Sequence, residues 1–174
     1  MRPLTPTELE ALFAKLAKYI QASIRLLLKD SAVRLHNNRV YLLKNELLSH
    51  SVSAAKLQSI GMLLGKFTHS GKFKLSVTCL PLLEQYATYK IWLKPQAEMS
   101  FLYGNHILKA HLQKITQDTL MHQGVLVLNM QNVPLGFGTT SKSGLEIRGL
   151  DPTQICCFHQ ADVGEYLRDQ DTLI

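Results

Sequence analysis

Pro95 stands where the chain changes character, just after the apolar run at residues 91–93. A proline cannot donate to a β ladder, and it favours an extended conformation at Lys94. Residues 1–94 hold 14 Lys and Arg against 5 Asp and Glu, whereas residues 95–174 hold 5 against 8. The net charges are therefore +9 and −3, within the +6 of the whole chain. We predict two modules, residues 1–94 and 95–174, with residues 91–93 as the last strand of the first.

Composition favours a globular intracellular protein. Hydrophobic residues make up 46% of the chain, which is too many for a mainly disordered protein. No apolar run reaches the roughly 20 residues that cross a bilayer, so we expect no membrane partner. Glu8 and Glu10 fall where a signal peptide would need an apolar segment. The cysteines, an odd number at 3, are typical of reduced thiols.

The first module is predicted to be an α/β domain with a mostly antiparallel sheet. Thr5, Pro6 and Glu8 have the spacing of a capping box that opens a helix ending near residue 21. Asn37-Asn38 tolerates the positive φ of a tight hairpin turn. We predict strands over residues 24–29, 32–36, 39–43, 60–68, 72–79 and 89–93, a weak helix over residues 45–59 and a short helix over residues 81–86.

The second module is predicted to be a small β barrel. Gly136 and Gly138 lie in one of its strands, where they allow either a bulge or the close approach of another backbone. Many short strands with Gly and Pro turns favour a closed barrel, so the fold class of the chain is α+β. We predict strands over residues 124–130, 135–140 and 155–159, helices over residues 96–103 and 162–168, a strand then a short helix over residues 107–115, and a loop over residues 141–149.

Basic residues are the candidate nucleic-acid contacts, because neutralising phosphates supplies most non-specific affinity. Around Gly71, basic residues interleave with Phe67 and Phe73; this pattern fits either phosphate contact with base stacking or a solvated hairpin with two core phenylalanines. For His159 a packed position at a strand end is favoured over an RNA contact. The candidates in the first module are Arg34, Arg39, Lys66, Lys72 and Lys74. Those in the second module are Lys109, Lys114, Gly136, Gly138, Lys142, Arg148, His159 and Arg168.

Catalytic and cofactor motifs are not recognisable in the sequence. Residues 61–67 approach a phosphate-binding loop, but three residues rather than four separate the glycines, and Phe follows the Lys where Ser or Thr is required. Cys156, Cys157 and His159 lack the spacing of a zinc site. There is no nucleophile elbow. We therefore expect no cofactor, no metal and no enzymatic activity, with an RNA-modification enzyme as the less favoured alternative.

Several long, non-repetitive motifs together resemble a known family. They are MRPLT, RLHNNRVY, KIWLKPQAEMSFLYGNHILK, PLGFG and FHQADVGEYLR. Over residues 1–168 they look like the Nip-seven family of large-subunit (60S) ribosome biogenesis factors. The resemblance implies an α/β N-terminal domain followed by a PUA domain, a pseudo-barrel that binds structured RNA. It also implies a non-catalytic, nuclear and nucleolar factor that acts on pre-rRNA in pre-60S particles beside other assembly factors.

The charge distribution adds two expectations. Because the C-terminal module carries net −3, the basic first module should supply most of the salt-dependent attraction to RNA. A protein-interaction adaptor is the other class of function, using either Phe101, Leu102 and Tyr103 or the acidic C-terminal tail to bind a partner. The sequence carries no clear oligomerisation signal, so we expect a monomer outside the particle.

Overall fold

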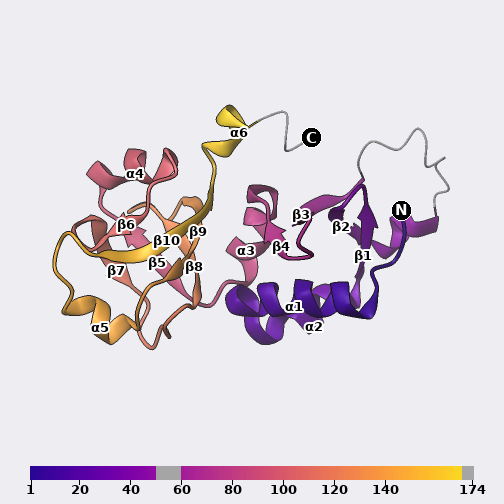
Figure 1. The fold of residues 1–174 in the computed structure, drawn as a ribbon, viewed down its shortest axis with the longest axis horizontal. Coiled ribbons are helices and arrows are strands. Elements are labelled where there is room, and N and C mark those ends of the chain that lie inside the picture. The colour runs from indigo at the N-terminus through magenta and orange to yellow at the C-terminus, as the bar shows by residue number, and fades with distance from the viewer. Residues whose placement is uncertain (50–59, 170–174) are drawn as a thin grey trace.

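The chain folds into two modules that lie side by side along its long axis (Figure 1). The structure is a computed structural model, and it describes residues 1–49 and 60–169. None of the described helices is long and apolar enough to span a membrane. The first module contains an antiparallel sheet in the order β1-β2-β3-β4. Its elements are α1 (Pro6–Ile20), α2 (Ile24–Lys29), β1 (Ser31–His36), β2 (Arg39–Lys44), β3 (Met62–Phe67), β4 (Phe73–Leu75) and α3 (Leu80–Tyr86).

The helix α1 begins at the predicted capping box. The Thr5 hydroxyl accepts a hydrogen bond from the Glu8 N–H, and the Glu8 carboxylate accepts one from the Thr5 N–H. Arg2 donates to the same carboxylate, and this bond is the main reason that the pKa of Glu8 falls to about 2. Because Arg2 also exchanges backbone hydrogen bonds with Leu35, the N-terminus ties the helix to β1.

Local signals in the first module predict the β1–β2 hairpin correctly and the element before it wrongly. The β1–β2 turn falls on Asn37 and Asn38, with φ of 48° and 61°. Residues 24–29 form α2 rather than a strand. Ile24, Leu27 and Leu28 have the spacing of one helical face, and they pack into the core. That spacing was the signal in the sequence that favoured a helix.

The second strand pair of this module is shorter than predicted. β4 ends at Leu75, and residues 77–79 form a 3₁₀ turn that leads into α3, which confirms the helix expected over residues 81–86. Residues 45–49 form a 3₁₀ helix, and the remainder of the weak helix expected over residues 45–59 lies outside the described residues.

The second module is a nearly closed barrel with the strand order β6-β10-β9-β8-β5-β7. All its pairs are antiparallel except β5 with β8. The strands expected over residues 124–130, 135–140 and 155–159 are present, and so is the helix over residues 96–103. Its elements are β5 (Lys90–Leu93), α4 (Pro95–Leu102), β6 (Ile107–Leu108), β7 (Leu112–Ile115), β8 (Gly124–Leu128), β9 (Pro134–Thr140), α5 (Gly144–Arg148), β10 (Ile155–Asp162) and α6 (Glu165–Arg168).

Two expectations at the edges of this module are wrong. The strand at residues 91–93 does not close the first module, because β5 pairs with β7 and β8. Residues 144–148 form α5 inside the expected loop, capped by Ser143. The strand and short helix expected over residues 107–115 are present as β6 and a 3₁₀ turn, and residues 112–115 add the strand β7. An apolar run predicts a strand but not its partner. We therefore propose that the modules divide at residues 87–89, in place of the 94/95 boundary.

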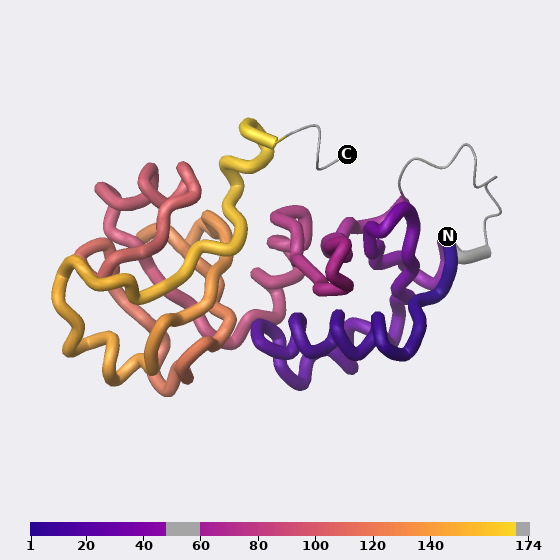
Figure 2. Tube along the Cα trace, in the orientation of Figure 1, coloured from indigo at the N-terminus to yellow at the C-terminus, as the bar shows by residue number. Residues whose placement is uncertain are grey.

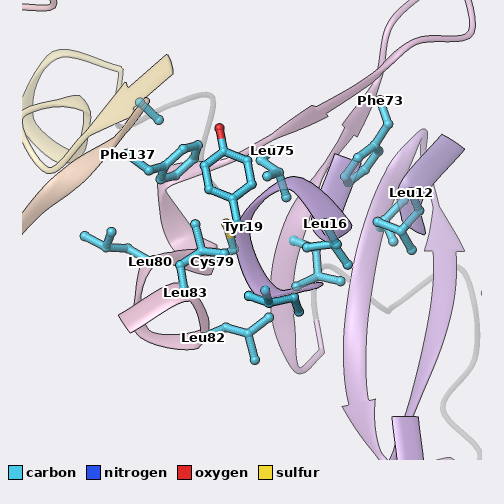
Figure 3. Close-up of a cluster of buried hydrophobic side chains, with 14 of the residues drawn as sticks. Leu12, Leu16, Tyr19, Phe73, Leu75, Cys79, Leu80, Leu82, Leu83 and Phe137 are labelled. Carbon is cyan, nitrogen blue, oxygen red and sulfur yellow. The ribbon is translucent and has the colours of Figure 1, made fainter. Parts of the chain in front are cut away.

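A shared hydrophobic cluster joins the two modules. Tyr19 of α1 meets Phe137 of β9 edge-on, with 5.4 Å between the ring centroids (Figure 3). Leu83 of α3 and Leu126 of β8 belong to the same buried cluster. The Gln123 side-chain amide also donates to the Lys18 carbonyl. The relative placement of the modules therefore depends on core packing.

Candidate nucleic-acid interface

A row of basic residues crosses the whole N-terminal sheet. The ladder pairs His36 with Arg39, Arg39 with Lys66, and Lys66 with Lys74, one residue from each of the four strands. Residues that pair across a ladder share a face of the sheet. At about 4.8 Å between strands, the row is roughly 14 Å long. We call these residues, His36, Arg39, Lys66 and Lys74, the basic row.

The basic row opposes its own folding, which is a reason to expect an anionic ligand. Like charges directly opposite one another on a sheet are destabilising. Among the described residues, Lys66 and Lys74 have no ion-pair partner, and both side chains are exposed. A polyanion bound along the row would relieve this repulsion.

The aromatic residues near the row belong to the core. Phe67 and Phe73 pair on the opposite face, with ring centroids 5.2 Å apart, and Phe73 is buried. The arrangement around Gly71 is therefore the second of the two expected ones, a solvated hairpin with two core phenylalanines. Of the five candidates in the first module, three lie in the row. Arg34 lies two residues before His36 on β1, and Lys72 lies in the turn before β4.

Two lysines that the sequence analysis did not select extend the positive surface. α1 packs next to β4, which brings Lys15 and Lys18 toward Lys74. Burial lowers the pKa of Lys15, and the charges of Lys18 and Lys74 lower it further. The periodicity of α1 shows that these lysines lie off its apolar face, but only the tertiary contact places them beside the basic row.

A cavity lies between the basic row and the last helix of the chain. It has a volume of about 270 Å³. The Cα trace returns from the barrel toward the first module at α6 (Figure 2), which brings Glu165 and Asp169 to the cavity. Burial raises the pKa of Glu165, Asp162 adds to the rise, and Lys74 opposes it. The residues that line the cavity are Arg39, Leu63, Gly65, Lys66, Lys74, Leu75, Ser76, Glu165 and Asp169.

A buried carboxylate holds α6 in this position. Asp162 is fully buried, and its Oδ2 lies 2.6 Å from His159 Nε2 and 2.8 Å from Arg168 Nη2. Its Oδ1 accepts from the Gly164 N–H at 2.7 Å, and Arg168 also donates to the Leu102 carbonyl. The bonds of His159 and Arg168 to Asp162, and of Arg168 to Leu102, therefore position α6 against α4 and β10.

The packed alternative for His159 is consistent with its surroundings. Its ring lies 5.0 Å from that of Phe101. Burial is the main reason that the pKa of His159 is lowered; the charges of Arg168 and His106 act in the same direction, and Asp162 opposes them. The imidazole is then neutral at pH 7 and donates its Nε2 proton to Asp162.

Replacing Asp162 by Ala is expected to destabilise the protein by about 3 kcal/mol. The substitution leaves His159 and Arg168 without their shared acceptor, and breaking a buried ion pair costs about 3–5 kcal/mol. We take the low end because the Arg168 side chain is 35% exposed. The free energy of unfolding in urea is the measurement, with exposed Asp151→Ala as the control. Equal stability of the two variants would contradict the role of Asp162.

Neither candidate metal cluster fits a metal ion. His159, Asp162 and Glu165 offer ligand atoms within 4.8 Å of one another. However, a cation there would have to displace the Arg168 guanidinium from Asp162. Cys156 and Cys157 are buried, and burial raises the pKa of both thiols, that of Cys156 to about 11, so they stay protonated rather than becoming metal-binding thiolates.

The remaining candidates in the barrel do not form a common site. Lys114 lies over the ring of Trp92, with Nζ 4.9 Å from the centroid. Arg148 lines a smaller cavity at α5, and Lys142 lies in the loop before that helix. Lys109 lies in the 3₁₀ turn between β6 and β7.

Gly136 and Gly138 are buried against a neighbouring strand. A Cβ on Gly136 would fall on the Ala161 carbonyl oxygen, and a Cβ on Gly138 would fall on the Phe158 carbonyl oxygen. The expected close approach of another backbone is therefore confirmed, and that backbone is β10.

Family comparisons account for both modules. The model of the NIP7/UPF0113 pre-PUA domain matches residues 1–77, and that of the UPF0113 PUA domain matches residues 89–171. The chain is 51% identical over 179 residues to the 60S ribosome subunit biogenesis protein nip7 of Schizosaccharomyces pombe, covering 99% of each chain. The chain belongs to the NIP7 family. It is also 52% identical to the NIP7 homolog of Xenopus tropicalis, again over 99% of each chain.

Solved structures support the fold of this NIP7-family chain. A PUA-domain protein from Aeropyrum pernix K1 aligns with a TM-score of 0.64 at 12% identity, covering 99% of this chain and 90% of the other. A protein from Pyrococcus horikoshii OT3 aligns with a TM-score of 0.61 at 14% identity, covering 97% and 98%. The α+β fold class and the family resemblance drawn from the motifs are both confirmed.

Proposed function

We propose that this protein is a non-catalytic RNA-binding assembly factor of the large ribosomal subunit. The observation that carries the proposal is the basic row, which aligns cations across one sheet face without ion-pair partners for Lys66 and Lys74 among the described residues. The row would bind successive phosphates of pre-rRNA. Relatives about half identical over the full chain are named 60S ribosome subunit biogenesis proteins, which supports the assignment to this process.

The proposed place of action is the pre-60S particle in the nucleus and nucleolus. Its partners there would be pre-rRNA and other assembly factors, and the protein would be a monomer outside the particle. The basic row lies in the first module, so the N-terminal half supplies most of the salt-dependent attraction, and the barrel positions α6 beside it.

An exposed apolar pair on α4 favours a protein-docking role as the second candidate. Met99 in α4 and Tyr103 at its C-cap are 58% and 69% exposed and lie four residues apart, with the Tyr103 N–H bonded to the Met99 carbonyl. Phe101, which we expected to contribute, is buried against His159 and is not available. An adaptor surface would therefore use Met99 and Tyr103, and it is compatible with RNA binding elsewhere.

The test uses the full-length protein, because cutting at residue 94 would separate β5 from its sheet. We expect the affinity for single-stranded pre-rRNA fragments to fall steeply as salt rises, and the protein to leave the RNA chemically unchanged. Co-sedimentation with pre-60S particles tests the assembly role. Salt-independent RNA binding, or unaided cleavage or modification of pre-rRNA, would overturn the proposal.

A further inference from the structure

The side of α6 that faces the basic row is acidic. The Asp169 N–H bonds the Glu165 carbonyl, and residues four apart in this way share one side of a helix. Both carboxylates line the cavity of about 270 Å³ that Arg39, Lys66 and Lys74 also line. Burial raises the pKa of Glu165, and the charge of Lys74 opposes the rise. The carboxylates of α6 and the cations of the row therefore act on one another across this cavity.

The contacts that fix α6 come from the barrel. Arg168 donates to the Asp162 carboxylate and to the Leu102 carbonyl, and the Gly164 N–H also donates to Asp162. A Cβ on Gly164 would fall on the Leu102 carbonyl oxygen, so the start of the helix lies directly against the end of α4. α6 is thus tied to the barrel on one side and meets the first module across a cavity on the other (Figure 2).

An anionic ligand of the basic row has to compete with these carboxylates. A phosphate bound to Lys66 and Lys74 would lie opposite Glu165 and Asp169, and like charges repel. The cavity is smaller than the roughly 300–1,000 Å³ of sites that enclose a small ligand, and an RNA chain is larger still. A chain that binds the whole row therefore requires α6 to move away from this end of it.

We propose that α6 is an acidic strap over one end of the basic row, which an RNA chain displaces when it binds. The inference rests on the proposed function and adds its regulation. The row continues past the cavity to His36, so an RNA chain also contacts cations that the strap does not face. A small anion lacks these further contacts and leaves the strap in place. The strap thus favours an extended polyanion over short ones.

Arg168→Gln separates this device from an effect of net charge. The substitution removes a positive charge, which by itself weakens RNA binding. It also removes the bonds from Arg168 to Asp162 and Leu102 that hold the strap. We expect the full-length variant to bind oligouridylate at least about twofold more tightly at 0.15 M salt, because a larger fraction of the protein is then open to RNA. Fluorescence anisotropy measures the affinity, and thermal unfolding shows whether the variant is folded.

Glu165→Gln with Asp169→Asn is the second variant, and it keeps the anchor. We expect it to bind oligouridylate about threefold more tightly at 0.15 M salt, with a smaller gain at higher salt, because the Debye length is about 8 Å at 0.15 M and shortens as salt rises. The matched control is Asp118→Asn with Asp151→Asn. These two exposed acids lie near α5, at the end of the barrel away from the first module (Figure 1), and their loss should change the affinity much less.

Amide hydrogen exchange tests the displacement itself. α6 spans 4 residues, and an isolated helix below roughly 12 residues is marginal in water, so displacement should unfold it. The Arg168 and Asp169 N–H groups, which are bonded inside the helix, should exchange faster when oligouridylate is bound.

The possible outcomes separate the strap from the proposed function. If neither the parent protein nor any variant binds oligouridylate, the proposed function fails. If the parent binds, the strap is overturned by either of two results: no gain from Glu165→Gln with Asp169→Asn beyond that of the control, or unchanged exchange in α6. Weaker binding by a folded Arg168→Gln variant would show that Arg168 itself attracts RNA, and it would also overturn the strap.

Discussion

Replacing Lys66 and Lys74 together by Gln is expected to weaken the binding of single-stranded RNA about tenfold at 0.15 M salt. Each phosphate contact contributes roughly 0.7 to the slope of log affinity against log salt, so two lost contacts lower the slope by roughly 1.4. These residues pair directly across β3 and β4 in the basic row. Fluorescence anisotropy with a labelled RNA over a range of salt concentrations measures both quantities.

The same variant should be at least as stable as the parent protein. Opposed like charges on a sheet destabilise by about 0.2–1 kcal/mol, and the substitution removes two such pairs, Arg39 with Lys66 and Lys66 with Lys74. Removing a charge that serves binding commonly leaves stability equal or higher. Arg25→Gln with Lys29→Gln, on exposed positions of α2, is the matched control for the loss of two charges. An equal loss of affinity in this control would show that net charge, rather than the basic row, attracts RNA.

Replacing Tyr19 or Phe137 by Ala is expected to destabilise the protein by about 3–5 kcal/mol each, the usual cost of truncating a buried aromatic residue. The two rings meet edge-on at 5.4 Å, and exposures of 0% and 1% place both in the core (Figure 3). A double-mutant cycle should give a coupling of about 0.5–1.5 kcal/mol. Urea unfolding followed by circular dichroism is the measurement.

Tyr19→Phe provides the control for this pair. The Tyr19 hydroxyl is buried without a hydrogen-bond partner, so its removal should leave stability unchanged or raise it. Because the hydrophobic cluster includes α1, α3, β8 and β9, the parent protein should unfold in one cooperative transition. Two separate transitions would show that the modules are independent and that the shared cluster contributes little.

The sequence predicted the elements whose signals are local. The capping box at Thr5 and Glu8 and the positive φ at Asn37 and Asn38 each depend on a few neighbouring residues, and each is present. The motifs that span the chain identified the family. The strand predicted over residues 24–29 is wrong, because Ile24, Leu27 and Leu28 have the spacing of one helical face that packs into the core.

The candidate site was predicted in part. The sequence indicated Arg39, Lys66 and Lys74 as separate basic residues. The register of the paired strands aligns them in one row. The sequence did not indicate Ser76, whose hydroxyl is buried without a hydrogen-bond partner once the chain is folded. Nor could it show that His159 and Arg168 share Asp162 as a hydrogen-bonding partner.

The sequence by itself determined the capped first helix, the Asn37-Asn38 turn, the family, and the excess of positive charge in the first half. Tertiary structure decided that β5 belongs to the barrel, that four strands align their basic residues, and that α6 returns to cover a cavity beside them. The physical reason is the separation along the chain of the residues that interact. Capping and turn conformation act within a few residues, whereas strand partners and cavities depend on contacts between segments far apart in the chain.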